Sequence, residues 1–335
     1  MNTDGVLNGI AATSPRNAWA VGSTSGHASS ALIERWNGRV WKPARSPGPA
    51  GGVLHGVAAA SARSAWAVGC TDNCGSRSRT LIERWNGISW KQVLTPAPEG
   101  GGLDAVAAVT ARDAWAVGTT RTTGGKALIV HWNGKSWNRA PSPAPAGSSL
   151  SGVAAVSARL AWAAGCSHCG TPSMQTLILR WNGKSWKAVP SPAPAGSIFF
   201  GVAAASAASA WAVGVTGSGG TLIERWNGAS WKQVPDPVPG AGSFLFGVAA
   251  VSARSAWAVG ATGFAAGRPK PSILQWNGTS WKPVSSPGSG GGALNGVAVL
   301  SARSAWTAGC TTTSCDTDRG TPKALILHWN GSTWK

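Results

Sequence analysis

Short apolar segments separated by polar turns recur along the whole chain, and the unit between residues 200 and 239 shows the pattern clearly. Its first segment is made of small apolar residues, and in its second segment Trp211 and Val213 share one face by period-two alternation. Asn227-Gly228 signals a tight turn because both residues tolerate positive φ. Three prolines then end the ladder. The predicted strands of this unit are residues 200–205, 211–214, 221–226 and 231–234.

Tryptophan marks the units along the chain, because three sets of seven account for all 21 tryptophans. The first set lies in the second predicted strand, at Trp19, Trp66, Trp115, Trp162, Trp211, Trp257 and Trp306. The second set opens Trp-Asn-Gly, at Trp36, Trp85, Trp132, Trp181, Trp226, Trp276 and Trp329. The third set follows five residues later, at Trp41, Trp90, Trp137, Trp186, Trp231, Trp281 and Trp334. The chain therefore contains seven copies of one unit.

Four short strands in 46–49 residues are typical of a β-propeller blade. A single blade cannot bury both of its faces, so neighbours must stack and the array must close into a ring. The prediction is an all-β, seven-bladed propeller with four antiparallel strands per blade, forming one domain over residues 1–335. The blades are expected at about residues 5–49, 50–99, 100–146, 147–196, 197–241, 242–291 and 292–335.

The charge balance favours polyanionic partners, since 29 Lys and Arg against 11 Asp and Glu give a net charge of +18. A solvated basic surface without a ligand explains the same balance. No apolar run approaches the roughly 18 residues of a membrane span. The first residues lack a basic segment followed by an apolar stretch, so no signal peptide is expected in this chain.

Six cysteines form three close pairs, each in the variable loop between the second and third predicted strands. The pairs are Cys70 with Cys74, Cys166 with Cys169, and Cys310 with Cys315. Pairs that are present in some units and absent from others favour disulfides, which imply an oxidising compartment and a secreted or cell-surface protein. The best metal alternative is Cys166-Ser167-His168-Cys169, but zinc needs a fourth ligand and the other pairs contain no His. No metal site, redox Cys-x-x-Cys or cofactor is predicted.

Catalysis requires a few unlike residues that converge, whereas most polar positions here repeat from unit to unit. Glu34, Glu83 and Glu224 precede Arg-Trp-Asn-Gly, and the same position is aliphatic in the other units, which predicts a partly exposed strand face. The histidines are scattered, at His27, His55, His131, His168 and His328. The chain is therefore not expected to be an enzyme.

An arginine lies in the first turn of every unit except the fifth, where Ala208 replaces it. The six are Arg16, Arg63, Arg112, Arg159, Arg254 and Arg303. Equivalent turns of a closed propeller share one face, so these residues predict a ring of cations that an anionic polymer can engage at several points. Alternatively, each arginine caps its own turn or packs its stem over a neighbouring tryptophan.

Tryptophan also offers a flat face to sugars. The first two tryptophan sets are expected in the packing between blades. The third set lies near a turn, beside Lys42 or its counterparts, so it is expected to be the most exposed and is the candidate set for ligand contact.

Residues 219–231, Gly-Gly-Thr-Leu-Ile-Glu-Arg-Trp-Asn-Gly-Ala-Ser-Trp, resemble the hairpin of Asp-box (BNR) propellers. With Ala-Trp-Ala-Val-Gly upstream they also resemble repeats of the Ycf48-type photosystem assembly factors, Kelch repeats, and repeats of uncharacterised actinobacterial exported proteins. The resemblance implies the fold, which serves sialidases, lectins and assembly factors alike. Asn replaces the Asp of the Asp-box, and a chain without Tyr cannot supply the sialidase nucleophile.

The leading hypothesis is a non-enzymatic extracellular propeller, monomeric, that binds a glycan, an acidic polymer or a protein through several sites or serves as an interaction scaffold. Specificity is expected from the variable loops at residues 23–31, 70–80, 119–126, 166–176, 215–221, 261–272 and 310–324. One alternative is a glycosidase or lyase acting on acidic polysaccharide, for which Asp72, Asp316 and Asp318 lie in equivalent loops. Another is a sensor domain of a longer protein. Nucleic acid is disfavoured because disulfides argue for another compartment.

Overall fold

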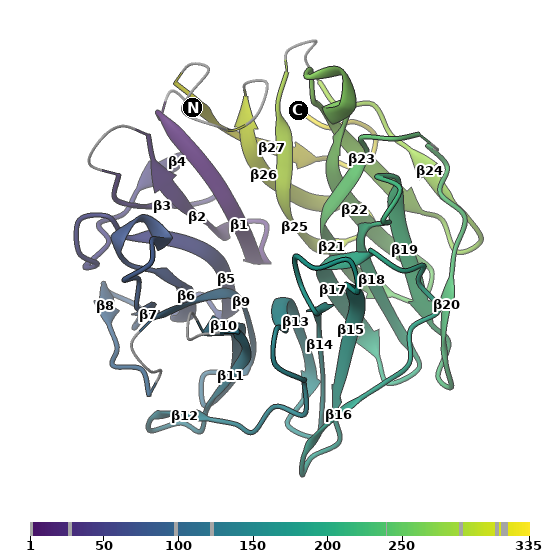
Figure 1. Ribbon diagram of the computed structural model, residues 1–335. Coiled ribbons are helices and arrows are strands. Elements are labelled where there is room, and N and C mark those ends of the chain that lie inside the picture. Colours follow the sequence, from purple (N-terminus) through teal and green to yellow (C-terminus); the bar gives the residue numbers. More distant parts are fainter. Residues whose placement is uncertain are drawn as a thin grey trace.

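The computed structural model describes residues 3–25, 29–96, 100–120, 124–238, 240–287, 291–311, 315 and 321–335. Seven antiparallel sheets stand around a central axis, and the innermost strand of each sheet contacts the innermost strand of the next (Figure 1). The innermost strand of the last sheet contacts that of the first, which closes the ring. The predicted seven-bladed propeller is confirmed.

The strands follow the predicted order, from the axis outward, in every blade. The innermost strands are β1 (Gly5–Ser14), β5 (Val53–Ser61), β9 (Gly101–Thr110), β13 (Ser149–Ser157), β17 (Ile198–Ser206), β21 (Phe244–Ser252) and β25 (Ala293–Ser301). The second strands are β2 (Asn17–Thr24), β6 (Ser64–Cys70), β10 (Asp113–Thr120), β14 (Leu160–Ser167), β18 (Ser209–Val215), β22 (Ser255–Thr262) and β26 (Ser304–Thr311).

The outer half of each blade holds the Trp-Asn-Gly hairpin. The third strands are β3 (Ala31–Trp36), β7 (Thr80–Trp85), β11 (Lys126–Trp132), β15 (Gln175–Trp181), β19 (Thr221–Trp226), β23 (Lys270–Trp276) and β27 (Lys323–Trp329). The outermost strands are β4 (Trp41–Pro43), β8 (Trp90–Gln92), β12 (Trp137–Arg139), β16 (Trp186–Ala188), β20 (Trp231–Gln233) and β24 (Trp281–Pro283). In the seventh blade a single bridge between Trp329 and Trp334 takes the place of a fourth strand.

Among the described residues, helix is confined to two short segments in loops, η1 (Asp72–Cys74) and η2 (Phe264–Ala266). Within the described part of the chain, neither these nor any other helix has the length and apolar character needed to cross a bilayer.

Glycine permits the close approach of blades at the axis. Gly9 of β1 lies so near β5 that a Cβ on it would come 2.9 Å from the carbonyl oxygen of His55. The register of β1 with β2 also shifts between Leu7 and Gly9, so an extra residue, Asn8, bulges from the ladder. The same shift recurs in other blades and gives each one a single bulged residue beside the axis.

Tryptophan triads hold neighbouring blades together. The ring of Trp19 in the first blade lies 4.8 Å from Trp85 and 5.0 Å, edge-on, from Trp90 of the second blade. The arrangement repeats at every interface. It includes the seam, where Trp306 contacts Trp36 and Trp41 at 5.1 and 5.4 Å. The first two sets thus pack between blades as predicted.

The prediction that the third tryptophan is the exposed one is wrong for six of seven blades. Trp90, Trp137, Trp186, Trp231, Trp281 and Trp334 are only 3–5% exposed. The cause is the edge-on contact, which presses the third ring against the preceding blade. At the seam Trp41 remains half-buried.

A cation or imidazole covers most of these triads. The guanidinium of Arg35 lies 5.1 Å from the Trp19 ring and 4.9 Å from the Trp85 ring. Arg84, Arg180 and Arg225 repeat this contact. In the third and seventh blades His131 and His328 lie 4.1 Å from the tryptophan ring instead. Burial lowers the pKa of His328.

The glutamate position of the third strand is inside the molecule, contrary to the prediction of a partly exposed face. Glu34, Glu83 and Glu224 are 1%, 0% and 0% exposed. Glu83 accepts a hydrogen bond from Ser46 Oγ at 2.6 Å, and Glu224 accepts one from Ser191 Oγ at 2.8 Å. Both serines follow the outermost strand of the preceding blade, so each glutamate ties down a linker between blades.

At the seam the N-terminal segment supplies this bond, because Thr3 Oγ1 donates to Glu34 at 3.1 Å. Backbone bonds from Ala324 to Thr3 and from Gly5 to Pro322 join the same segment to the last blade. Val130, Leu179, Leu274 and Leu327 fill the equivalent buried position in the remaining blades.

The seam tryptophan offers a test of the triads. Trp231→Ala should lower the free energy of unfolding by about 3–5 kcal/mol, the usual cost of removing a buried Trp. Trp41→Ala changes the equivalent residue where it is half-buried, so it should cost about half as much or less. Urea denaturation of both variants measures the difference. Equal losses would contradict the unequal burial of the two rings.

The buried glutamates predict that the protein is more stable at mildly acidic pH than at alkaline pH. Burial raises the pKa of Glu83 and of Glu224 from the ordinary 4.5 to about 7. Between these values the native chain binds protons that the unfolded chain does not, so the free energy of unfolding falls as pH rises through this window. The double variant Glu83→Gln/Glu224→Gln, which is always neutral, should be more stable than the parent at pH 8 by on the order of 2 kcal/mol per site.

At pH 5, close to the unfolded pKa of 4.5, most of this stability gap should be absent. Urea denaturation at both pH values measures this, with Asp72→Asn, which changes an exposed carboxylate, as the matched control. An unchanged stability gap between pH 5 and pH 8 would show that the buried glutamates do not titrate in this range.

Candidate functional site

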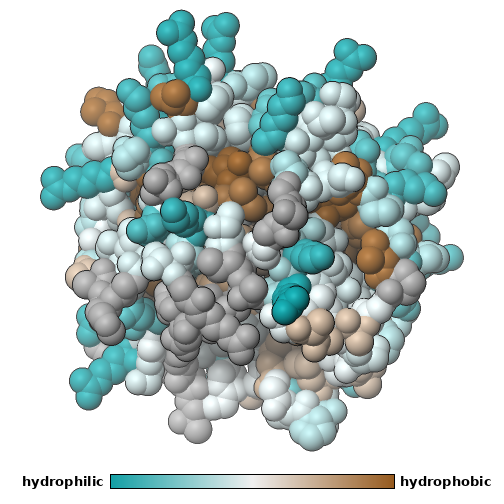
Figure 2. Space-filling view, turned by 90° about the horizontal axis from the view of Figure 1, so that it is seen from above, coloured by the Kyte–Doolittle hydropathy of each residue, from teal (hydrophilic) through white to brown (hydrophobic). Residues whose placement is uncertain are grey.

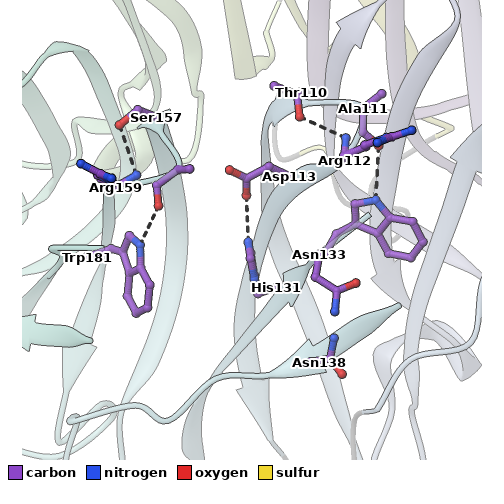
Figure 3. Close-up of polar contacts among 12 residues, drawn as sticks. Thr110, Ala111, Arg112, Asp113, His131, Asn133, Asn138, Ser157, Arg159 and Trp181 are labelled. Carbon is purple, nitrogen blue, oxygen red and sulfur yellow. Dashed lines mark hydrogen bonds and ion pairs between the residues drawn. The ribbon is translucent and has the colours of Figure 1, made fainter. Parts of the chain in front are cut away.

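The six turn arginines all lie between the first and second strands of their blades and all are exposed. Their stems lie over the hairpin glycine of the same blade: a Cβ on Gly38 would be 3.1 Å from Cγ of Arg16. Figure 3 shows the turns of the third and fourth blades, where the Arg112 amide donates to Thr110 Oγ1 and the Arg159 amide to Ser157 Oγ. In the alternative prediction, each turn arginine packs its stem over a neighbouring tryptophan. Arginines of the third strands, such as Arg35 and Arg84, make these tryptophan contacts instead. Binding by the turn arginines stays a prediction.

The three cysteine pairs are joined as disulfides. Each lies where the second strand of its blade enters the loop to the third, which shortens the free span of that loop. Asp316 and Asp318, named with Asp72 as candidate acids, lie outside the described residues.

A groove of about 520 Å³ runs between the first and second blades at the outer edge of the ring. It is lined by Trp19, Arg35, Asn37, Lys42, Pro43, Ala44, Arg45, Trp85, Ile88, Ser89 and Trp90. The lining contains the cations Arg35, Lys42 and Arg45 and no carboxylate. Ile88 at its edge is 86% exposed, whereas the equivalent hairpin position of the next blade is Lys135. The groove is thus cationic and partly apolar. Viewed from above, the molecule shows hydrophilic side chains standing out around its margin with hydrophobic residues recessed between them (Figure 2).

The mouth of the central channel departs from the sevenfold pattern. A cavity of about 240 Å³ is lined by one bulged residue from each blade: Asn8, His55, Asp104, Ser151, Phe200, Phe246 and Asn295. Sequence reasoning missed this ring. The signal was available, because this position precedes Gly-Val or Gly-Ile in nearly every unit yet changes type around the ring.

Contacts within this ring join neighbouring blades. Asn8 donates to the Leu54 carbonyl and Asn295 to the Leu7 carbonyl, both at 2.9 Å. The Phe200 and Phe246 rings lie 5.6 Å apart. One side of the mouth is therefore polar and the other aromatic.

The histidine of the polar side has unlike partners on both of its nitrogens. His55 Nδ1 lies 3.1 Å from Asp104 Oδ1, and Nε2 lies 3.5 Å from Cys74 Sγ and 4.0 Å from Cys70 Sγ. His55 thus faces the cysteine pair of its own blade and a carboxylate of the next. The best metal alternative in the sequence, around His168, is not among the convergent His, Cys and carboxylate groups of the described residues, whereas His55 with Cys70 and Cys74 is.

Carboxylates do not converge on a solvent-filled site within the described part of the chain. Glu34, Glu83 and Glu224 are sealed between blades, with pKa values raised by burial. Asp104 is engaged by His55, and Asp113 by His131 at 2.8 Å (Figure 3). The groove and the channel mouth together contain a single carboxylate, Asp104. Neither of these two cavities therefore brings a pair of described acids together.

No protein-family model matches the chain, and no curated protein does. Among solved structures it is similar to Ycf48 bound to D1 peptide, with a TM-score of 0.65 and 13% identity over 98% of this chain and 95% of that one. It is also similar to the BP39L lectin from Burkholderia pseudomallei, with a TM-score of 0.62 and 16% identity over 99% and 98%. A GH74 xyloglucanase from Xanthomonas campestris matches at a TM-score of 0.59 and 14% identity, over 99% of this chain and 55% of that one. At these identities the similarity shows the β-propeller fold.

Proposed function

We propose that the chain is a non-enzymatic binding propeller that recognises an anionic polysaccharide in the groove between its first and second blades. The observation that carries the proposal is the described lining of that groove, where three cations lie with the exposed Ile88 and without a carboxylate. Cations attract uronate or sulfate groups, while apolar edges such as Ile88 can contact a sugar face. The net charge of +18 adds a long-range attraction to the same class of ligand.

The paired-acid mechanism of a glycosidase is not favoured, because it needs two carboxylates flanking one bond. Among the described acids that do not contact a histidine, Glu34, Glu83 and Glu224 are buried between blades, and the others line neither the groove nor the channel mouth. The lectin among the similar structures supports a binding role, whereas the xyloglucanase, at 14% identity, is similar in fold. Three disulfides support a secreted or cell-surface location.

The groove variant Lys42→Ser/Arg45→Ser tests the proposal. Its affinity for polygalacturonate and dextran sulfate, measured by isothermal titration calorimetry at about 50 mM salt, should fall roughly tenfold, and binding should weaken further at about 300 mM salt. Neutral dextran should not bind to the parent or the variant.

Two controls remove the same charge elsewhere. Lys187→Ser/Lys282→Ser changes exposed lysines of outermost strands in other blades, and Arg112→Ser/Arg159→Ser removes two cations of the turn ring. Both should lose less than about threefold affinity, the size of a non-specific charge effect. Equal losses of affinity in all three variants would show that the polysaccharide is held by the overall positive charge and not by the groove. A larger loss of affinity in the arginine variant would place the binding site at the turn arginines. If the parent binds no polysaccharide, the remaining candidate partner is a protein.

A further inference from the structure

The cysteine pair of the second blade differs from the other two pairs in its surroundings. Cys70 is fully buried at the end of β6, and Cys74 is half-buried in η1. His55 of β5 faces both sulfurs through Nε2. The residues equivalent to His55 beside the other pairs are Ser151 and Asn295, which have no soft ligand atom. Only the second blade, among the described residues, brings an imidazole to its cysteine pair.

The distances suit a metal ion once the two sulfurs are free thiolates. Zinc bonds of about 2.3 Å to sulfur and about 2.0 Å to nitrogen, at a tetrahedral angle, place the N and S atoms about 3.6 Å apart. His55 Nε2 lies 3.5 and 4.0 Å from the two sulfurs. Cys70 and Cys74 are separated by three residues, within the Cys-x2–4-Cys spacing of zinc ligands.

Asp104 prepares the histidine for this role. Its Oδ1 lies 3.1 Å from His55 Nδ1, so the neutral imidazole carries its proton on Nδ1 and leaves the Nε2 lone pair directed at the sulfurs. Outer carboxylates of this kind orient metal-bound histidines and raise their basicity. His55, Cys70 and Cys74 therefore form a potential ligand group whose histidine is already oriented by Asp104.

We propose that Cys70, Cys74 and His55 form a redox-gated site for a thiophilic divalent metal ion such as Zn²⁺. A dithiol reductant transfers two electrons and two protons to the Cys70–Cys74 disulfide, which becomes two thiols, and the reductant becomes a disulfide itself. The metal ion then displaces the two thiol protons, which pass to solvent, and binds both sulfurs and the Nε2 lone pair. His55 and Asp104 line the channel mouth, from which a water or solute can supply the fourth ligand.

The sulfurs of Cys70 and Cys74 are thus either bonded to each other or bound to the metal ion. In an oxidising compartment the pair is closed, and in a reducing one it binds metal. The blade 4 pair, Cys166 and Cys169, occupies an equivalent loop and serves as the internal control, because its own histidine, His168, does not converge with its two sulfurs. Metal binding here does not depend on polysaccharide binding, because the His55-Cys70-Cys74 group shares no residue with the groove.

Cobalt titration of the intact chain tests the site. After reduction with a phosphine under argon, one equivalent of Co²⁺ should produce thiolate-to-cobalt charge-transfer absorption, which Zn²⁺ should abolish by displacement. The oxidised chain should give no such bands. Asp104→Asn should weaken metal affinity about 10–100-fold, as expected for a lost outer carboxylate, and His55→Ala at least as much.

Matched double variants identify the sulfurs. Cys70→Ser/Cys74→Ser should abolish the absorption, and Cys166→Ser/Cys169→Ser should retain it at full affinity. Far-UV circular dichroism checks that each variant is folded. If Cys70→Ser/Cys74→Ser does not fold, the cobalt affinity of His55→Ala is the deciding measurement. Absence of the bands in the reduced parent, their survival in Cys70→Ser/Cys74→Ser, or full affinity in His55→Ala would overturn the proposal.

Discussion

Edge-on packing of tryptophan between blades is the contact on which the rest of the structure depends. A four-stranded blade has two faces and cannot cover either one by itself, so its stability comes from its neighbours. The triad of Trp19, Trp85 and Trp90 buries three large rings in one such interface, and the same triad recurs around the ring. Because the ring closes through Trp306, Trp36 and Trp41, no blade is left with an uncovered apolar face.

Once the triads are in place, the layer beside them can vary. The position over the tryptophans is Arg35 in the first blade, His131 in the third and Gln275 in the sixth. The buried third-strand position alternates between a glutamate that binds a linker serine and an aliphatic side chain. These exchanges are tolerated because side chains of different chemistry fill the same space beside the tryptophans.

Features that depart from the sevenfold pattern carry the functional proposals. The groove between the first two blades has Ile88 and Arg45 at positions that hold other residues elsewhere. The channel mouth changes from asparagine, histidine and aspartate on one side to phenylalanine on the other. A residue that recurs in every blade serves packing, whereas a residue found once in a rigid ring is free to serve a ligand. The scaffold thereby fixes unlike side chains at defined separations.

The sequence by itself determined the number of blades, the order of strands and the pairing of cysteines, because all three are written in local patterns: period-two alternation, Asn-Gly turns and close cysteine spacing. Tertiary structure decided which faces those strands cover. Alternation assigns Glu83 to a face of its strand but does not say that the neighbouring blade will bury it, and proximity to a turn does not expose Trp231. His55 and Asp104 are 49 residues apart and meet only because successive bulges line one axis when the ring closes.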